Sequence, residues 1–172
     1  MSSVEIRDED PSDAGAIRLV HRQAFASDVE ARLVDLLRER NKALISLVAV
    51  TGQDIRGHIL FSAVSVAYAA PAIRSIGLAP VAVLPEFQRS GIGSSLILEG
   101  LERCKRAGYH LVVMLGDPAY YHRFGFRRAR AFGLENEYGV DEEFMVLEPQ
   151  PGVFQEASGM VRYAPEFKEA EC

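Results

Sequence analysis

One stretch, Ile76–Gly108, constrains most strongly what this chain can fold into. It begins with the apolar run Ile76–Leu84, whose length and composition fit a largely buried β-strand. Pro85 ends the strand, because proline cannot donate to a sheet ladder. After Gln88–Gly93 the apolar residues recur at helical spacing, and Gly108 stands where a helix commonly ends. The stretch therefore predicts a strand, a glycine-containing loop and a helix.

The junction between this loop and the helix has the features of an anion site. A helix begins with main-chain N–H groups that have no acceptor inside the helix, and its dipole adds partial positive charge there. Gly91 and Gly93 have no Cβ, so an anion can approach the main chain closely. The junction is thus either a phosphate-binding site or a tight turn that needs glycine only for its geometry. The stretch alone favours neither interpretation.

Two familiar phosphate loops do not fit the residues, and a third does. A P-loop needs a lysine after its last glycine, whereas Gly93 is followed by two serines. A dinucleotide fingerprint needs a small residue where Leu96 stands. The pattern Gln88-x-x-Gly91-x-Gly93 after a buried strand resembles the acyl-CoA pyrophosphate loop of the GNAT superfamily of N-acetyltransferases.

A second motif strengthens this resemblance. In GNAT enzymes a short helix that ends in Tyr-x-x-x-Gly-Phe follows the strand after the pyrophosphate helix. Tyr121, Gly125 and Phe126 match that pattern, in the expected order after Gln88. The two motifs together look like a branch of predicted bacterial GNAT acetyltransferases with poorly defined substrates. The resemblance covers Ile76–Phe126 well and the flanking segments in outline.

The chain as a whole predicts an α+β fold with mixed α/β character. Periodicity and turn signals predict strands near 4–7, 43–51, 55–68, 76–84, 110–115, 143–148 and 160–163, and helices near 14–25, 29–40, 93–107 and 119–124. The central helix supplies a crossover, so the strand at 110–115 is expected to lie parallel to the one at 76–84. Segment 127–142 receives no assignment. The resemblance implies a GNAT-like twisted mixed sheet with helices on both faces, whose splayed central parallel strands hold the cofactor's pantetheine arm.

Composition narrows the class of protein. A length of 172 residues, with 48% apolar and 25% charged residues, fits a single globular domain over 1–172. No apolar run of membrane-spanning length and no signal peptide is evident, and two cysteines do not suggest a disulfide framework. A net charge of −5 argues against a general nucleic-acid surface. We expect a cytoplasmic protein without a nucleic-acid or membrane partner; a homodimer stays open.

The resemblance implies acetyl-CoA as cosubstrate and assigns residues to it. Main-chain N–H groups of the loop would surround the pyrophosphate, and the central strand would pair with the pantetheine and supply an N–H to the developing oxyanion. The cofactor-binding residues so implied are Val81, Ala82, Val83, Gln88, Arg89, Ser90, Gly91, Ile92, Gly93 and Ser94.

For the chemistry, the resemblance gives Tyr121 the role of the catalytic acid that protonates the leaving sulfur. The general base stays unassigned, because the central strand carries no carboxylate. Four other titratable residues fit helix caps, solvated charges or a satisfied sheet histidine better than a base: Asp28, Glu30, Asp117 and His58. Cys104 is expected to be a small core residue, and the histidine spacing predicts no metal site.

Two function classes follow. The leading one is an acetyl-CoA-dependent N-acetyltransferase that moves the acetyl group directly from the thioester to a primary amine of a small molecule or protein. The alternative is a non-catalytic acyl-CoA-binding regulatory module, which the missing strand carboxylate keeps open. Nothing in the residues identifies the amine acceptor.

Overall fold

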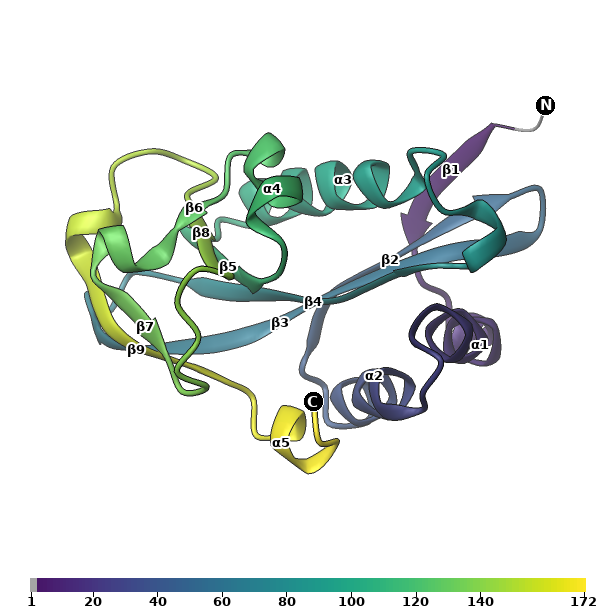
Figure 1. The fold of residues 1–172 in the computed structure, drawn as a ribbon, viewed down its shortest axis with the longest axis horizontal. Helices are drawn as coiled ribbons and strands as arrows, with labels where there is room; N and C mark the ends of the chain where they lie inside the picture. The colour runs from purple at the N-terminus through teal and green to yellow at the C-terminus, as the bar shows by residue number, and fades with distance from the viewer. Residues whose placement is uncertain (1–2) are drawn as a thin grey trace. The chain divides into compact units, whose positions relative to one another are not determined.

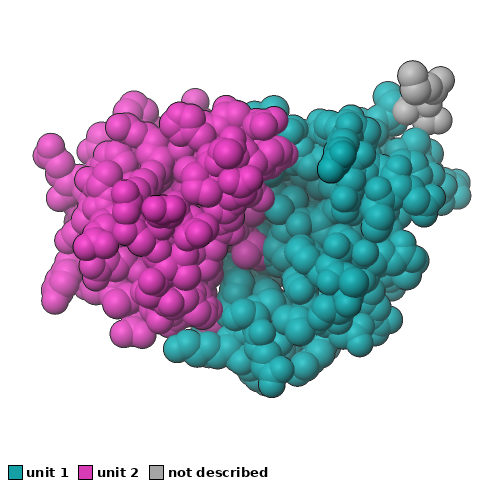
Figure 2. Space-filling view, in the orientation of Figure 1, with its two compact units in different colours: residues 1–62, 80–100, 165–172 teal, residues 63–79, 101–164 magenta. Residues whose placement is uncertain are grey.

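The computed structural model describes residues 3–172, and Figure 1 shows its helices and strands. The chain divides into two compact units, coloured separately in Figure 2. Unit 1 consists of the chain up to Ser62 together with Pro80–Gly100 and Pro165–Cys172, and unit 2 consists of Ala63–Ala79 and Leu101–Ala164. The single domain over 1–172 stays a prediction. No helix within residues 3–172 is long and apolar enough to cross a membrane.

Unit 1 is built on an antiparallel meander. Strand β1 (Val4–Asp8) pairs with β2 (Ala43–Thr51), which pairs through a tight hairpin with β3 (Asp54–Ala69). Gly52 allows this turn, since its φ of 63° lies in the left-handed region. The unit also contains α1 (Ala14–Phe25), α2 (Val29–Glu39), α5 (Glu166–Glu169), the short 3-10 helices Pro11–Asp13 and Pro85–Phe87, and the first part of α3 (Ile92–Arg106). Fully buried residues such as Leu37, Leu47 and Phe61 form its core.

Unit 2 contains two parallel strand pairs. The start of β4 (Ser75–Val83) pairs in parallel with β5 (Leu111–Leu115), and β7 (Leu134–Asn136) pairs in parallel with β9 (Ala157–Tyr163). The antiparallel pairs are β5 with β8 (Phe144–Leu147), β8 with β6 (Arg127–Arg128), and β9 with the end of β3. Its helices are α4 (Pro118–Tyr121) and the 3-10 helices His122–Phe124, Ala129–Phe132 and Phe154–Glu156.

These pairings confirm the predicted α+β class and the predicted parallel partner of the central strand. The ladder joins Ser75, Ile76 and Gly77 to Leu111, Val112 and Val113, and the remaining residues of β4 continue the strand beyond it. Segment 127–142, which the sequence left unassigned, contains β6, a 3-10 helix and β7.

Glycines let helix α3 lie close to β3 within unit 1. A Cβ at Gly57 would lie 3.0 Å from Leu96 Cδ1, 3.1 Å from the carbonyl oxygen of Ala82 and 3.2 Å from Ile92 Cγ2. A Cβ at Gly100 would lie 2.5 Å from Phe61 Cε1, well inside van der Waals contact. A side chain at Gly57 would thus be tightly crowded, and one at Gly100 would require Phe61 or the helix to move.

We expect Gly100→Ala to destabilise the protein by about 1–3 kcal/mol, because Phe61 must move or the helix must shift. Gly15→Ala is the matched control, since nothing lies within 4 Å of the added Cβ in α1 and alanine favours a helix interior. Chemical denaturation of both variants measures the difference. Equal or higher stability of Gly100→Ala would contradict the close packing of α3 on β3.

Two histidines form a buried hydrogen-bonded chain in unit 1. His21 Nε2 lies 2.8 Å from His58 Nδ1, and His58 Nε2 lies 2.7 Å from Ser46 Oγ. Both imidazoles are fully buried. Burial lowers the pKa of His21 from 6.5 to about 4, and it lowers the pKa of His58 well below its ordinary value. His58 is thus a satisfied sheet histidine, as the sequence suggested.

This pair predicts a pH dependence of stability. Because the folded-state pKa is depressed, the unfolded chain binds more protons between pH 6.5 and about pH 4, so the free energy of unfolding falls as pH is lowered through this range. His21 alone should contribute a loss of about 2 kcal/mol between pH 7 and pH 5. Denaturant titrations at both pH values measure it.

The variants separate the histidines from other titrating groups. In His21→Leu the decrease in the free energy of unfolding between pH 7 and pH 5 should be clearly smaller than in the parent. In His122→Gln, which changes an exposed histidine, this decrease should be the same as in the parent. A carboxylate such as Asp13, whose pKa is lowered by its hydrogen bond to Arg7, contributes its loss at lower pH. A stability that stays constant from pH 7 to pH 5 would contradict neutral buried imidazoles.

Candidate active site

The loop after β4 is fixed at its start by contacts within unit 1. The N–H of Leu84 donates to the carbonyl oxygen of Arg56 at 2.9 Å, which ties the end of β4 to β3. The guanidinium of Arg56 lies 4.1 Å from the ring centroid of Phe87, in the 3-10 helix that follows. The chain therefore enters the loop from a defined place and direction.

The loop itself turns through two left-handed residues. Arg89 has a φ of 62° and Gly91 a φ of 90°. No atom lies within 4 Å of a Cβ built on Gly91, so its conformation, rather than a contact inside the protein, requires glycine. Between them, the hydroxyl of Ser90 donates to the carbonyl oxygen of Phe87. Such sharp turns of consecutive residues form the concave main-chain surfaces that bind anions.

Helix α3 begins directly after this turn and presents its first N–H groups there. The first helical bond runs from the N–H of Ser95 to the carbonyl oxygen of Gly91 at 3.0 Å. The N–H groups of Ile92 and Gly93 precede it and have no acceptor inside the helix. Ile92 is buried, whereas Arg89 and Gly91 are exposed. The side chain of Ile92 thus anchors the helix start, while Gly91 directly before it is exposed to solvent.

The structure gives Gln88 a bracing contact. Its side-chain amide donates to the carbonyl oxygen of Val83 at 3.0 Å, which joins the loop to the last residue of β4. Val81 and Val83 are partly exposed and Ala82 between them is buried. The ten residues that the sequence assigned to the cofactor therefore form one continuous strand, loop and helix start in unit 1, with Gln88 holding the loop against the strand.

Tyr121 belongs to unit 2, at the end of α4. Helix α4 is capped by Asp117, whose Oδ1 accepts from the N–H of Ala119 at 3.0 Å, so this carboxylate has the capping role that the sequence favoured. Burial, and then the neighbouring Tyr120, raises the pKa of Tyr121 to about 12. The Tyr121 phenol therefore keeps its proton at neutral pH, as a general acid must.

The ring of Tyr121 is held by its neighbours. It meets Tyr120 and Phe126 edge to face, at centroid distances of 5.0 Å and 6.0 Å. A Cβ at Gly116 would lie only 2.7 Å from Tyr121 Cε2, so glycine is required there. The role of Gly116 is not evident from the sequence, because this contact joins two residues that periodicity does not relate.

Asp28 and Glu30, two further candidates for the general base, differ in their contacts. Asp28 is exposed and its Oδ1 lies 2.7 Å from Arg22 Nε in an ion pair. Oε2 of Glu30 is buried without a hydrogen-bond partner.

Burial raises the pKa of the Cys104 thiol to about 12, which fits a neutral core residue. Within residues 3–172 no group of three His, Cys, Asp or Glu side chains is placed to hold a metal ion.

Comparison with known proteins identifies related chains. Residues 5–129 match the family model described as an acetyltransferase (GNAT) domain. The Escherichia coli (strain K12) protein named "Uncharacterized N-acetyltransferase YhbS" is 36% identical over 164 residues, which is 94% of this chain and 97% of that protein.

Two solved structures are similar over nearly the whole chain. The crystal structure of YhbS from Escherichia coli in complex with CoA has a TM-score of 0.92 at 35% identity and covers 98% of this chain and 93% of its own. The structure of a GNAT family acetyltransferase from Brucella melitensis in complex with acetyl-CoA has a TM-score of 0.81 at 36% identity. The match covers 97% of this chain and 99% of that one.

Proposed function

Because the chain belongs to the GNAT family and is an N-acetyltransferase, we propose that it moves an acetyl group directly from acetyl-CoA to a primary amine of a small molecule or protein. The observation that carries this proposal is the exposed left-handed turn at Arg89 and Gly91 directly before the start of α3. Support also comes from the two similar structures, which hold CoA and acetyl-CoA.

In this proposal the pyrophosphate of acetyl-CoA lies against the N–H groups of Arg89–Ser94. The helix dipole of α3 adds attraction at that place, since partial positive charge collects at a helix N-terminus. Val81 and Val83 bind the pantetheine through their main chain, and Gln88 keeps the loop in position through its bond to Val83. In this proposal, main-chain N–H groups and the helix dipole bind the pyrophosphate, and no lysine is needed.

The reaction then needs no covalent enzyme intermediate. The amine nitrogen attacks the thioester carbonyl carbon, a C–N bond forms, and the C–S bond breaks. A main-chain N–H near Ala82 or Val83 stabilises the oxyanion, and Tyr121 gives its proton to the departing thiolate. The proton of the amine passes to water. The neutral, buried thiol of Cys104 supports direct transfer, because a thiol with a pKa of about 12 is a poor nucleophile.

Thiol release from acetyl-CoA, followed with a chromogenic thiol reagent across a panel of small amines and lysine peptides, tests the proposed function. At least one amine should raise the rate well above hydrolysis. Tight acetyl-CoA binding with no amine-dependent release across the whole panel would favour the alternative, a non-catalytic acyl-CoA-binding module, which the lack of a carboxylate in Leu78–Val83 suggests.

We expect Gly93→Val to weaken acetyl-CoA binding at least tenfold, because a branched side chain would crowd the first turn of α3 where the pyrophosphate approaches. Calorimetry of the folded variant measures the affinity. Gly15→Val, which changes an exposed glycine in α1 with open space around it, is the control and should bind acetyl-CoA like the parent. Unchanged affinity of Gly93→Val would remove the loop from the binding site.

Tyr121→Phe separates the hydroxyl from the ring. The ring contacts with Phe126 and Gly116 persist, so the fold and acetyl-CoA affinity should change little. Turnover should fall by roughly 10²–10⁴-fold, the usual effect of losing a general acid. Tyr120→Phe is the adjacent control and should retain turnover. Parent-like turnover of Tyr121→Phe would leave water as the proton donor.

A further inference from the structure

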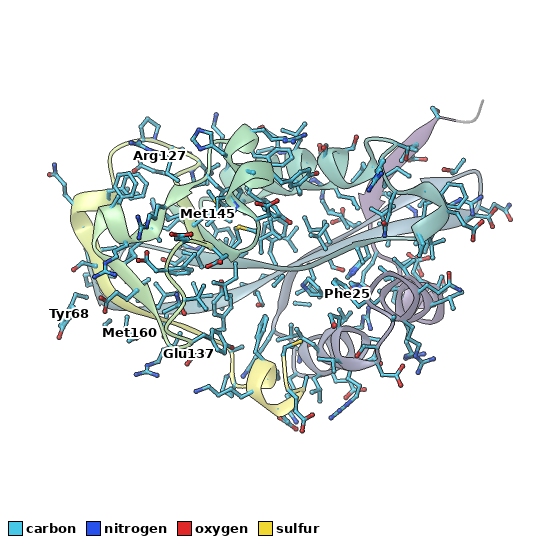
Figure 3. All side chains as sticks on the ribbon, viewed as in Figure 1. Phe25, Tyr68, Arg127, Glu137, Met145 and Met160 are labelled. Carbon is cyan, nitrogen blue, oxygen red and sulfur yellow. The ribbon has the colours of Figure 1, made fainter. Side chains whose placement is uncertain are left out.

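Unit 2 contains a cavity of about 240 Å³ that the proposed transfer chemistry does not use. Its apolar lining comes from Leu134, Val140, Phe144 and Met160, the last of which is labelled on β9 in Figure 3. A cavity of roughly 150 Å³ can hold benzene, so this space suits a molecule of amino-acid size.

The wall of this cavity is a preformed loop. Asn136 is 3% exposed, and its Oδ1 accepts from the N–H groups of Tyr138 at 3.0 Å and Val140 at 3.3 Å. Its Nδ2 donates to the carbonyl oxygen of Val140 at 2.6 Å. One side chain thus closes the segment 136–140 into a fixed turn, and binding sites for small molecules are usually preformed in this way.

The wall of the cavity carries one arginine, Arg130, which is paired with an aspartate. The carboxylate of Asp141 accepts from Arg128 Nε at 2.9 Å and from Arg130 Nη1 at 3.0 Å, so two guanidiniums share one carboxylate. A guanidinium has five N–H donors, and the bond from Nη1 leaves Arg130 able to bind a second carboxylate. Arg130 and Asp141 both line the cavity.

The cavity also has a carboxylate of its own. Glu135 lies on β7 and lines the cavity. Among residues 3–172, no hydrogen bond or ion pair engages the Glu135 side chain. Glu135 and Arg130 both line this cavity, so a carboxylate and an arginine that can bind a further anion are available to one small molecule.

We propose that this cavity binds an apolar α-amino acid. The ligand's carboxylate pairs with Arg130, its ammonium group pairs with Glu135, and its side chain lies against Val140 and Met160. The inference goes beyond the proposed function, since it requires neither acetyl-CoA nor acetyl transfer.

Calorimetry on the full chain without acetyl-CoA tests the proposal with three related probes. L-Leucine carries both charges, leucinamide lacks the carboxylate, and 4-methylpentanoate lacks the ammonium group. Leucine should bind at least tenfold tighter than either analogue. Arg130→Gln should abolish the preference for leucine over leucinamide, and Glu135→Gln should abolish the preference for leucine over 4-methylpentanoate.

Matched controls come from the same unit. Arg127→Gln changes an arginine that packs on the ring of Phe132, and Glu156→Gln changes an exposed carboxylate; neither side chain lines the cavity, so both variants should bind leucine like the parent. Arg127 is labelled in Figure 3. The folded Gly93→Val protein should also keep leucine binding, which separates this site from acetyl-CoA binding. No leucine binding, equal binding of all three probes, or parent-like selectivity in both cavity variants would overturn the proposal.

Discussion

The structure of unit 1 depends on how closely helix α3 approaches strand β3. Gly57 and Gly100 create two places where the helix and the strand touch without a side chain between them, at Ile92 and at Phe61. Because Ile92 is also the first residue of α3, this packing fixes where the helix starts. The left-handed turns of Arg89 and Gly91 then deliver the chain from β4 to that point. The loop and the start of α3 are therefore positioned by packing against β3.

The parts of this arrangement that could be predicted are those that depend on neighbouring residues in the sequence. The strand, loop and helix follow from an apolar run, Pro85, two glycines and helical spacing, and the structure reproduces them as β4 and α3 within a residue or two. The roles of Gly57 and Gly116 could not be predicted, because each depends on a side chain distant in sequence or outside any periodic pattern. The strands of segment 127–142 could not be predicted from the sequence either. Its strands have only two and three residues, too few for alternation to appear.

Buried polar groups are a second set of features whose partners the sequence did not predict. The chain His21–His58–Ser46 joins α1 to two strands, and its imidazoles stay neutral because burial penalises their charge. Glu166 of α5 is 1% exposed and accepts from Lys42 Nζ at 2.7 Å, which fastens the C-terminal helix within unit 1. Glu166 needs such a partner, because a buried carboxylate left without one is costly. These contacts stabilise the scaffold that holds the loop, and they leave the chemistry of transfer to other residues.

The central claim is that the main-chain N–H groups of Arg89–Ser94 bind the pyrophosphate of the cofactor. A titration of ¹⁵N-labelled protein with CoA, followed by amide chemical shifts, tests it most directly, because it reports on each N–H separately without any substitution. The account predicts that the largest downfield amide proton shifts fall on the residues between Arg89 and Ser94 and saturate together with binding. Saturable CoA binding that leaves these amides unshifted would contradict it.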